Sequence, residues 1–542
     1  MKFIKDFKIA CIMDEFTYEC FKYESNFILL KIESWSDTLI REKIELLLVE
    51  SAWKGNNKEW QYKISDLHIR KDKTLKEVTE YCQANNIPTV FWNKEDPFNF
   101  EHFIEAASYF DYIFTSDSAI VPRYKEILGH DRIYSLPFAA QPAIHNPVDK
   151  DKEKNGEIAF AGSWYNHKYS ERRKDLQLLL DLAIPYGLHI YDRMNRHKNT
   201  NYHFPEDYKS YIQGYLPYQE ILKKYKQYKV FINVNTVKNS TTMLARRVFE
   251  LLACGTPLIS NYSLAIQNYL PGLVKIYESR TDMERYLQEL LKDKEIRDRL
   301  SLLGQREVFN RHTYTHRLES IFDFAGLPYK KRALPQVMII ATISKGSTIK
   351  HIINNFSRQK YPHKELVLFL NDQEISQEEW QKTNDNNVKV LRLDEKGDMG
   401  KHANYLLDKS DYEYIARFDE NAYYAADFLS DLMFAFKYTD ASVVGKASYY
   451  TCNDADNFLH VKNEGRENSY TDSLCKSTVI VKKDLLAPLI LAEILQENKV
   501  DLFCQEKSIK FYSTDRFNFV ENFFIKYTDT TIANECLNNI SI

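Results

Sequence analysis

Short apolar runs that alternate with helix-like stretches are the feature that most restricts how this chain can fold. Between residues 8 and 145 the runs read "KIACIM", "ELLLVES", "PTVFWN", "YIFTSD" and "IYSLPF". Such runs are typical of strands in a parallel sheet, and the stretches between them supply helices that cover its two faces. The pattern restarts after residue 157 with "IAFAGS", "LHIYDR", "KVFINVN", "TPLIS" and "VKIYES". We therefore predict an α/β protein with two tandem Rossmann-like domains.

Two polar stretches divide the chain of 542 residues. The first reads "HNPVDKDKEKNGE", and the second, "LPYKKRALPQ", places prolines on either side of a basic trio. Both compositions are typical of linkers. Beyond the second stretch, "VMIIATIS", "ELVLFLN" and "VKVLRLD" continue an α/β pattern of different order. The predicted domains span residues 1–147, 155–328 and 334–542.

The charge balance limits the partners of the chain. Lys and Arg number 73 against 76 Asp and Glu, for a formal charge of −3, so no overall positive field attracts nucleic acid. An anionic ligand must therefore be met by a local cluster of basic side chains. The eight cysteines lack metal-site spacing and predict reduced thiols, and no apolar run is long enough for an integral membrane segment. We expect a cytoplasmic protein with no nucleic-acid partner.

Acidic residues follow several of the predicted strands of the first domain. Asp14 and Glu15 come after the first run, and Asp96 comes shortly after "PTVFWN". Ligands of open α/β sheets bind at the carboxyl edge of the strands, and a carboxylate there can act as a general base. We therefore predict Asp14, Glu15 and Asp96 as catalytic candidates. A helix cap at Asp14 and a turn residue before a proline at Asp96 are the alternative interpretations.

The stretch "KNSTTMLARRVFELLACGTPLIS" joins a polar loop, a helix and a buried strand in the second domain. A helix N-terminus favours a phosphate, and Arg246 and Arg247 add two forked donors in its first turn. Glu250 lies about one turn further on and can accept both hydroxyls of a ribose. The alternative is a surface ion pair of Glu250 with Arg246, four residues earlier.

This stretch resembles the nucleotide-binding helix and strand of family-four-like GT-B glycosyltransferases. Together with "CIMDEFTYECFKYE", "FWNKEDP", "FAGSWY" and "GYLPY", it resembles the spore maturation protein CgeB family over residues 8 to 325. The resemblance implies that Gly162, Ser163 and Arg172 lie beside the donor diphosphate. Thr242 stands where many family-four enzymes carry a second glutamate, and we include it among the donor contacts.

The third domain resembles family-two GT-A glycosyltransferases, through "VMIIATISKGSTIKHIINNFSRQKYPHKELVLFLND" and "IARFDENAYYAADFLSDL". That family holds a divalent metal with two aspartates, but here the motif reads Asp419, Glu420, Asn421, and a neutral amide replaces the last carboxylate. Asp501 is the one candidate for its base. We predict a degenerate domain that binds an acceptor glycan, a partner or a second copy of the chain. The alternative is residual metal-dependent catalysis at Asp419 and Glu420.

The resemblances imply a glycosyltransferase that moves a sugar from a nucleoside diphosphate donor to a bacterial surface or spore glycan or glycoprotein. The reaction would take place between the first two domains without an essential metal or other cofactor. Two alternatives remain. One is an inactive scaffold that binds glycan or nucleotide, and the other is catalysis in the carboxy-terminal domain.

Overall fold

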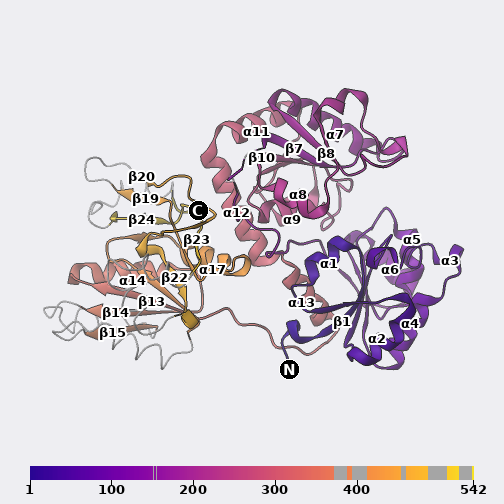
Figure 1. The fold of residues 1–542 in the computed structure, drawn as a ribbon, viewed down its shortest axis with the longest axis horizontal. Coiled ribbons are helices and arrows are strands. Elements are labelled where there is room, and N and C mark those ends of the chain that lie inside the picture. Colours follow the sequence, from indigo (N-terminus) through magenta and orange to yellow (C-terminus); the bar gives the residue numbers. More distant parts are fainter. Residues whose placement is uncertain are drawn as a thin grey trace. The chain divides into compact units, whose positions relative to one another are not determined.

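A computed structural model describes residues 1–150, 152–153, 155–370, 387–392, 412–452, 459–485, 509–523 and 540–542. The chain forms two compact units. The first unit comprises Met1–Pro147 and Asp151–Arg332, and the second comprises Val148–Lys150 and Ala333–Ile542. The first unit contains two six-stranded sheets, which define its first and second lobes (Figure 1). Among the described residues, no helix is long and apolar enough to cross a membrane.

The sheet of the first lobe is parallel throughout, in the order β2-β1-β3-β4-β5-β6. Every residue of β3 and β4 is buried, as expected for central strands covered by helices on both faces. The strands are β1 (Lys8–Ile12), β2 (Asn26–Leu29), β3 (Leu46–Glu50), β4 (Thr89–Asn93), β5 (Tyr112–Thr115) and β6 (Ile133–Ser135). The helices are α1 (Glu15–Phe21), α2 (Trp35–Glu42), α3 (Leu67–Arg70), α4 (Thr74–Ala84), α5 (Phe100–Ala107) and α6 (Val121–Leu128).

The sheet of the second lobe is also parallel, in the order β12-β11-β10-β7-β8-β9. Its strands are β7 (Gly156–Gly162), β8 (Leu188–Asp192), β9 (Ile212–Gly214), β10 (Tyr228–Asn233), β11 (Leu258–Ser260) and β12 (Lys275–Ile276). Its helices are α7 (Ser170–Ala183), α8 (Tyr218–Tyr225), α9 (Arg246–Ala253), α10 (Leu264–Tyr269), α11 (Arg280–Lys292), α12 (Lys294–Arg311) and α13 (Tyr314–Phe324).

Helix α13 leaves the second lobe and packs against the first (Figure 1). The ring of Phe324 stacks on Tyr134 of β6 with 4.0 Å between centroids, and Phe322 meets Phe7 edge-on at 4.8 Å. Arg317 Nε donates to the carbonyl oxygen of Pro137 at 2.8 Å. These contacts join the two lobes into one unit and fix the facing edges of their sheets.

The second unit holds a mixed eight-stranded sheet, β15-β14-β13-β16-β22-β18-β23-β21, and a four-stranded sheet, β17-β24-β19-β20. The strands of the larger sheet are β13 (Val337–Ile343), β14 (Lys364–Leu370), β15 (Val388–Arg392), β16 (Tyr414–Phe418), β18 (Val443–Gly445), β21 (Ser469–Thr471), β22 (Ile480–Lys482) and β23 (Phe511–Ser513). Those of the smaller sheet are β17 (Tyr423–Tyr424), β19 (Tyr449–Cys452), β20 (Leu459–Lys462) and β24 (Phe519–Glu521). The described helices are α14 (Ile349–Arg358) and α17 (Phe428–Tyr438).

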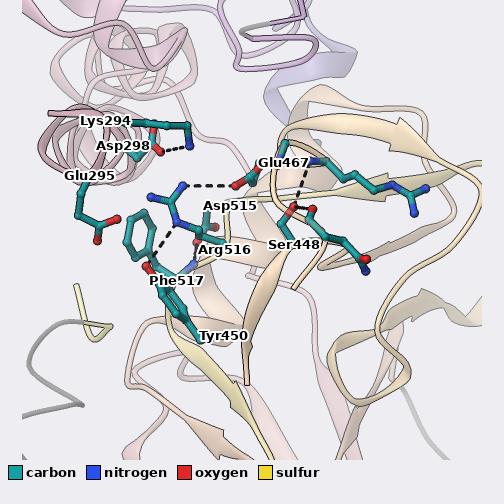
Figure 2. A network of polar contacts seen from close by, with 12 residues as sticks. Lys294, Glu295, Asp298, Ser448, Tyr450, Glu467, Asp515, Arg516 and Phe517 are labelled. Carbon is teal, nitrogen blue, oxygen red and sulfur yellow. Dashed lines mark hydrogen bonds and ion pairs between the residues drawn. The ribbon is translucent and has the colours of Figure 1, made fainter. Parts of the chain in front are cut away.

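Buried charges in the second unit are matched by opposite charges. Figure 2 shows the guanidinium group of Arg516 directed at Glu467, with Nη1 3.3 Å from Oε1, and its Nε donates to Tyr450 Oη at 3.3 Å. The Lys446 side chain is fully buried, and its Nζ lies 3.1 Å from Asp515 Oδ1. Asp515 and Arg516 lie between β23 and β24 in the sequence.

The predicted α/β class, with two tandem Rossmann-like sheets and a third α/β region, is confirmed. The domain boundaries stay predictions. Strands β2 and β9 were not predicted. Strand β9 is a short edge strand without an apolar run, whereas β2 is a short edge strand within the run "FILL", which was overlooked. The antiparallel strands β20 and β21 were missed for the same reason, since their residues alternate between half-buried and exposed.

Candidate functional site

Three arginines gather at the carboxyl edge of the second sheet, and we call Arg172, Arg193 and Arg247 the arginine cluster. Arg193 follows β8, Arg172 lies in the first turn of α7, and Arg247 is the second residue of α9. Arg172 Nη1 donates to the carbonyl oxygen of Ser163 at 3.2 Å, and Arg193 Nε donates to the hydroxyl of the same residue at 3.2 Å. The loop after β7 therefore orients two of the three guanidinium groups.

The arginine cluster lacks carboxylate partners. Among the residues that the structure describes, no carboxylate oxygen lies within 4.0 Å of these three guanidinium groups. Burial lowers the pKa of Arg172 to about 10, and the positive charges of Arg247 and Arg193 act in the same direction. The Nε atom of Arg247 is buried and has no hydrogen-bond partner in this part of the chain. Such a cluster attracts a ligand with several negative charges, and its forked donors match phosphate oxygens.

Gly162 and Ser163 lie beside the cluster, and their place beside the donor diphosphate stays a prediction. A Cβ atom added at Gly162 would lie 2.6 Å from Cζ of the Phe160 ring, so side-chain packing alone requires glycine there. Ser163 is 2% exposed, and both of its oxygens accept from arginines. Its role in this structure is to place Arg172 and Arg193. The importance of Arg193 was missed in the sequence, although "LHIYDR" ends with it at a strand end.

Glu250 is completely buried and fully engaged with protein groups. Its Oε1 accepts from Arg246 Nε at 2.8 Å and from Tyr218 Oη at 2.8 Å, and its Oε2 accepts from Tyr225 Oη at 3.2 Å. Burial opposes the charge, but Arg246, the hydrogen bond from Tyr218 and the charge of Arg247 outweigh it and lower the pKa of Glu250. The pair with Arg246 was the alternative interpretation, although it is buried instead of lying on the surface. Glu250 can accept a ribose only after Tyr218 or Arg246 moves.

His145 completes this buried group from the segment that links the two lobes. Its Nδ1 accepts from the backbone N–H of Gln141 at 2.8 Å, so the proton of the neutral ring lies on Nε2. Nε2 then donates to Tyr218 Oη at 2.9 Å, and Tyr218 donates to Glu250. Burial lowers the pKa of His145 to about 4, so the ring is neutral at neutral pH. His145 was not predicted, and Tyr218 ends the quoted motif "GYLPY" without a predicted partner, because the residues that they contact are far apart in the chain.

Thr242, predicted as a donor contact, binds the main chain of the first lobe. Its hydroxyl accepts from the backbone N–H of Ser118 at 2.8 Å and donates to the carbonyl oxygen of Ser116 at 2.9 Å. The neighbouring Ser240 donates to Asp117 Oδ1 at 2.5 Å. The loop before α9 is therefore bound to the turn after β5 in the first lobe. Its hydroxyls are engaged in protein contacts, and the donor contact of Thr242 stays a prediction.

Asp14 belongs to a charged group at the carboxyl edge of the first sheet, with Glu50 and Lys94, and we call these three the Lys94 triad. Lys94 Nζ lies 2.9 Å from Glu50 Oε1 and 3.2 Å from Asp14 Oδ2. Asp14 Oδ1 accepts from the backbone N–H of Gly55 at 3.1 Å. The Asp14 side chain is 18% exposed, whereas those of Glu50 and Lys94 are 1% and 3% exposed. Asp14 is therefore the member of the triad that a substrate can reach.

Glu15 and Asp96 lie apart from the Lys94 triad. Glu15 is the exposed first residue of α1 and points to no partner that would orient it. Asp96 is 1% exposed and accepts from Thr115 Oγ1 at 2.6 Å, from Asn93 Nδ2 at 3.0 Å and from Tyr124 Oη at 3.1 Å. Burial raises the pKa of Asp96 to about 7. Because both of its oxygens serve the core of the first lobe, its surroundings favour a structural role over the predicted catalytic one.

Phe16 connects the Lys94 triad with the second lobe. Lys94 Nζ lies 4.0 Å from the centroid of the Phe16 ring, and Arg246 Cζ lies 3.9 Å from the same centroid. A cation over an aromatic face is attracted by the ring quadrupole. The ring thus links the group that holds Asp14 to the group that holds Glu250.

The metal-motif residues of the second unit bind neighbouring protein atoms. Glu420 accepts from the backbone N–H of Ser344 at 3.0 Å and from Thr348 Oγ1 at 2.5 Å. Asp419 Oδ1 accepts from the backbone N–H of Asn421 at 2.8 Å. In the described residues, no group of three or more His, Cys, Asp or Glu side chains could hold a metal ion. Asp501 lies outside the described residues.

Two known families match this chain, one in each of its two units. Residues 172–323 match the family described as "Glycosyl transferase-like", and residues 337–484 match "Glycosyl transferase family 2". The two matches give a glycosyltransferase-like region of GT-B type followed by a family-two region. No curated protein matches the sequence.

Three solved structures illustrate what this chain is similar to. TarM from S. aureus matches with a TM-score of 0.30 at 13% identity, over 44% of this chain and 51% of TarM. T4 phage BGT, in complex with UDP and Mn2+, matches with a TM-score of 0.39 at 10% identity, over 59% and 100% of the two chains. An alpha-glucosyltransferase in complex with UDP and DNA has a TM-score of 0.42 at 13% identity, over 59% and 100%. The match thus spans about half the length of TarM, and the likeness is one of fold.

Proposed function

We propose that this glycosyltransferase moves a sugar from a nucleoside diphosphate to an acceptor hydroxyl between the two lobes of the first unit. The observation that carries the proposal is the arginine cluster, whose three guanidinium groups have no carboxylate within 4.0 Å in the described chain. A donor diphosphate supplies the missing negative charge. The same arginines would stabilise the diphosphate as it leaves, because fixed donors act most strongly where charge develops.

The rest of the donor is assigned to the group around Glu250. Glu250 accepts the ribose hydroxyls once Tyr218 or Arg246 has moved, since all its present partners are protein donors. Arg246 has one buried nitrogen, Nη1, without a hydrogen-bond partner in the described structure. This nitrogen is available to a second phosphate oxygen. No metal ion takes part in this scheme, because arginines perform the neutralisation that a hard cation performs elsewhere.

Asp14 is proposed as the base that takes the proton of the acceptor hydroxyl. It is partly exposed and held at a strand end, which are the properties that a general base needs. Glu15, the next residue, is exposed at the start of α1 and is the second candidate. The predicted acceptor is a glycan or glycoprotein of the bacterial surface or spore, and this part rests on the resemblance to the CgeB family.

A cytoplasmic location is part of the proposal. The six cysteines in the described part of the chain are all free thiols and all buried, and unpaired cysteines are usual in a reducing compartment.

The test is a thermal-shift screen with UDP-, GDP-, CMP- and dTDP-sugars, followed by measurement of nucleotide release. A donor that binds only the folded state raises the melting temperature. Arg247→Ala should abolish the shift, and Arg285→Ala, which removes a surface arginine paired with Asp282, should leave it unchanged. The donor site is wrongly assigned if none of the four donor classes raises the melting temperature. It is also wrongly assigned if a donor raises the melting temperature of Arg247→Ala as much as that of the natural protein.

A second candidate is catalysis in the second unit, which the match to family two favours. Against it, Glu420 is already bound by Ser344 and Thr348. We propose instead that this unit binds an acceptor glycan, a partner or a second copy of the chain. A metal-dependent transfer that Asp419→Ala removes would decide for the alternative.

A further inference from the structure

Lys94 is a buried cation whose position the proposed chemistry does not yet explain. It follows β4 directly, and the whole residue is 4% exposed. Burying an ammonium group is costly unless it is paired. Burial opposes its charge, but Glu50 and Asp14 outweigh burial and raise the pKa of Lys94. The lysine is therefore charged and held between two carboxylates.

Glu50 anchors both Lys94 and Asp14. Its Oε1 accepts from Lys94 Nζ at 2.9 Å and from the backbone N–H of Asp14 at 2.5 Å. One oxygen thus fixes both the lysine and the main chain of the aspartate. Its Oε2 is buried without a hydrogen-bond partner in the described structure. An unpaired buried oxygen costs stability, so the anchoring of Lys94 and Asp14 rests on Oε1 alone.

Each oxygen of Asp14 is directed by a separate donor. Oδ1 accepts from the backbone N–H of Gly55, and Oδ2 accepts from Lys94 Nζ. The two donors come from different loops of the sheet edge, so the plane of the carboxylate is fixed from both sides. Asp96 has three donors as well, but it is buried among core residues, whereas Asp14 remains partly exposed.

We propose that Lys94, anchored by Glu50, is a positioning residue that aims the Asp14 carboxylate at the acceptor hydroxyl. This inference rests on the proposed role of Asp14 as the base. Lys94 touches neither donor nor acceptor in this scheme and acts only through Asp14. Proton transfer needs heavy atoms within about 2.6–3.2 Å, and a displacement of about 1 Å costs on the order of 100-fold in rate.

The experiment compares Lys94→Met with Lys446→Met in the full chain. Lys446 is the matched control, because it is also a buried lysine with one carboxylate partner at 3.1 Å, but in the second unit. The donor used is UDP-glucose, UDP-N-acetylglucosamine or GDP-mannose, whichever raises the melting temperature most. Measurements are kcat for nucleotide release, the Kd of the matching nucleoside diphosphate and the melting temperature.

We expect kcat of Lys94→Met to fall about 100-fold with an unchanged nucleotide Kd, because the donor lies in the other lobe. Lys446→Met should lose comparable stability and keep its kcat. Lys94→Arg, which keeps the charge, should recover about tenfold of the loss. Glu50→Gln should lower kcat less, and the double variant should be no slower than Lys94→Met, since both act through Asp14.

The proposal is overturned if Lys94→Met keeps kcat within about threefold, or if Lys446→Met loses as much. A crystal structure of Lys94→Met adds a test that needs no donor. A turned Asp14 carboxylate supports the proposal, and an unmoved one contradicts it. Failure of the natural protein to bind any donor of the four-class thermal-shift screen would refute the proposed function instead, and the crystal structure would still decide the role of Lys94.

Discussion

Charged side chains are arranged in opposite ways in the two units. In the first unit, Arg172, Arg193 and Arg247 stand together, and the described chain places no carboxylate within 4.0 Å of them. In the second unit, Arg516 faces Glu467 and Lys446 faces Asp515. Arg172, Arg516 and Lys446 are buried, whereas Arg247 is partly buried and Arg193 is exposed. Of the two arrangements, only the second supplies the opposite charge from the protein itself.

The difference separates sites that bind from sites that hold the fold. Like charges that crowd together destabilise the folded state, and a ligand of opposite charge relieves the repulsion. A ligand cannot stabilise a matched buried pair in this way, because its charges are already neutralised. Removing one partner leaves the other unpaired at a cost of about 3–5 kcal/mol. The arginine cluster therefore indicates a ligand, whereas the pairs of the second unit indicate structure.

The sharpest test of this comparison exchanges one arginine of each kind for alanine. Arg247→Ala should lower transfer on the order of 100- to 1,000-fold, because a donor at the developing charge is lost, and should leave the melting temperature unchanged or raise it. Arg516→Ala should lower the free energy of unfolding by about 3 kcal/mol and leave transfer unchanged. Nucleotide release and thermal unfolding measure both effects. Equal destabilisation by the two variants would break the comparison.

Substitution of Glu250 tests whether a carboxylate that is already paired in the first unit can also bind a ligand. Glu250→Ala leaves Arg246 without its partner and should cost about 3 kcal/mol of stability. If Glu250 also accepts the ribose, the Kd of UDP or GDP should rise at least tenfold while that of inorganic pyrophosphate, which has no ribose, stays the same.

The control for Glu250 is Tyr225→Phe, which removes one hydrogen bond to the carboxylate and keeps the charge pair. It should leave the nucleotide Kd near that of the natural protein. Equal losses for nucleotide and pyrophosphate in Glu250→Ala would mean that the residue only supports Arg246.

The sequence predicted the parallel sheets and the helix that carries the proposed donor contacts. The apolar runs marked the central strands, since burial on both faces leaves a continuous apolar signal. The helix that carries Arg246, Arg247 and Glu250 was located by its polar residues beside an apolar turn. The pattern could not show that Glu250 is already bound by Tyr218, because that contact joins residues on different helices.

Asp96 gives a prediction about pH. Its pKa rises to about 7 in the folded protein from an ordinary value of 3.8, mainly through burial. The folded state therefore keeps this proton between those values while the unfolded chain releases it. The contribution of Asp96 to stability is present below about pH 4 and is lost as the pH rises through about 7.

Asp96→Asn lacks this titration. Relative to the variant, the natural protein should lose roughly 2–4 kcal/mol between pH 4 and pH 8, as about 1.4 kcal/mol per pKa unit implies. Melting temperatures at several pH values measure this loss. Transfer by Asp96→Asn should stay within about threefold of the natural rate. A complete loss of transfer with normal stability would restore Asp96 as a catalytic residue.

The first lobe shows why charge in the sequence does not by itself identify a catalytic acid. Asp14 and Asp96 both follow a strand of the same sheet, yet one is partly exposed beside Lys94 and the other is enclosed by Thr115 and Tyr124. The enclosing residues come from later strands and helices. Only the folded sheet edge distinguishes the two, and the same holds for Arg193, whose partner Ser163 lies on another strand.

The smallest expected effect concerns the metal motif of the second unit. Asp419→Ala should leave transfer unchanged, with or without added Mn²⁺, because Asp419 Oδ1 and the Glu420 carboxylate bind protein donors. Glu420→Ala should lower stability by about 1 kcal/mol, since Ser344 and Thr348 lose their acceptor. A Mn²⁺-dependent rate that Asp419→Ala abolishes would move catalysis to the second unit. The protein contacts of Asp419 and Glu420 would then belong to a metal-free state, and the metal would have to displace them. The comparison of the two units would no longer distinguish binding sites from structural pairs.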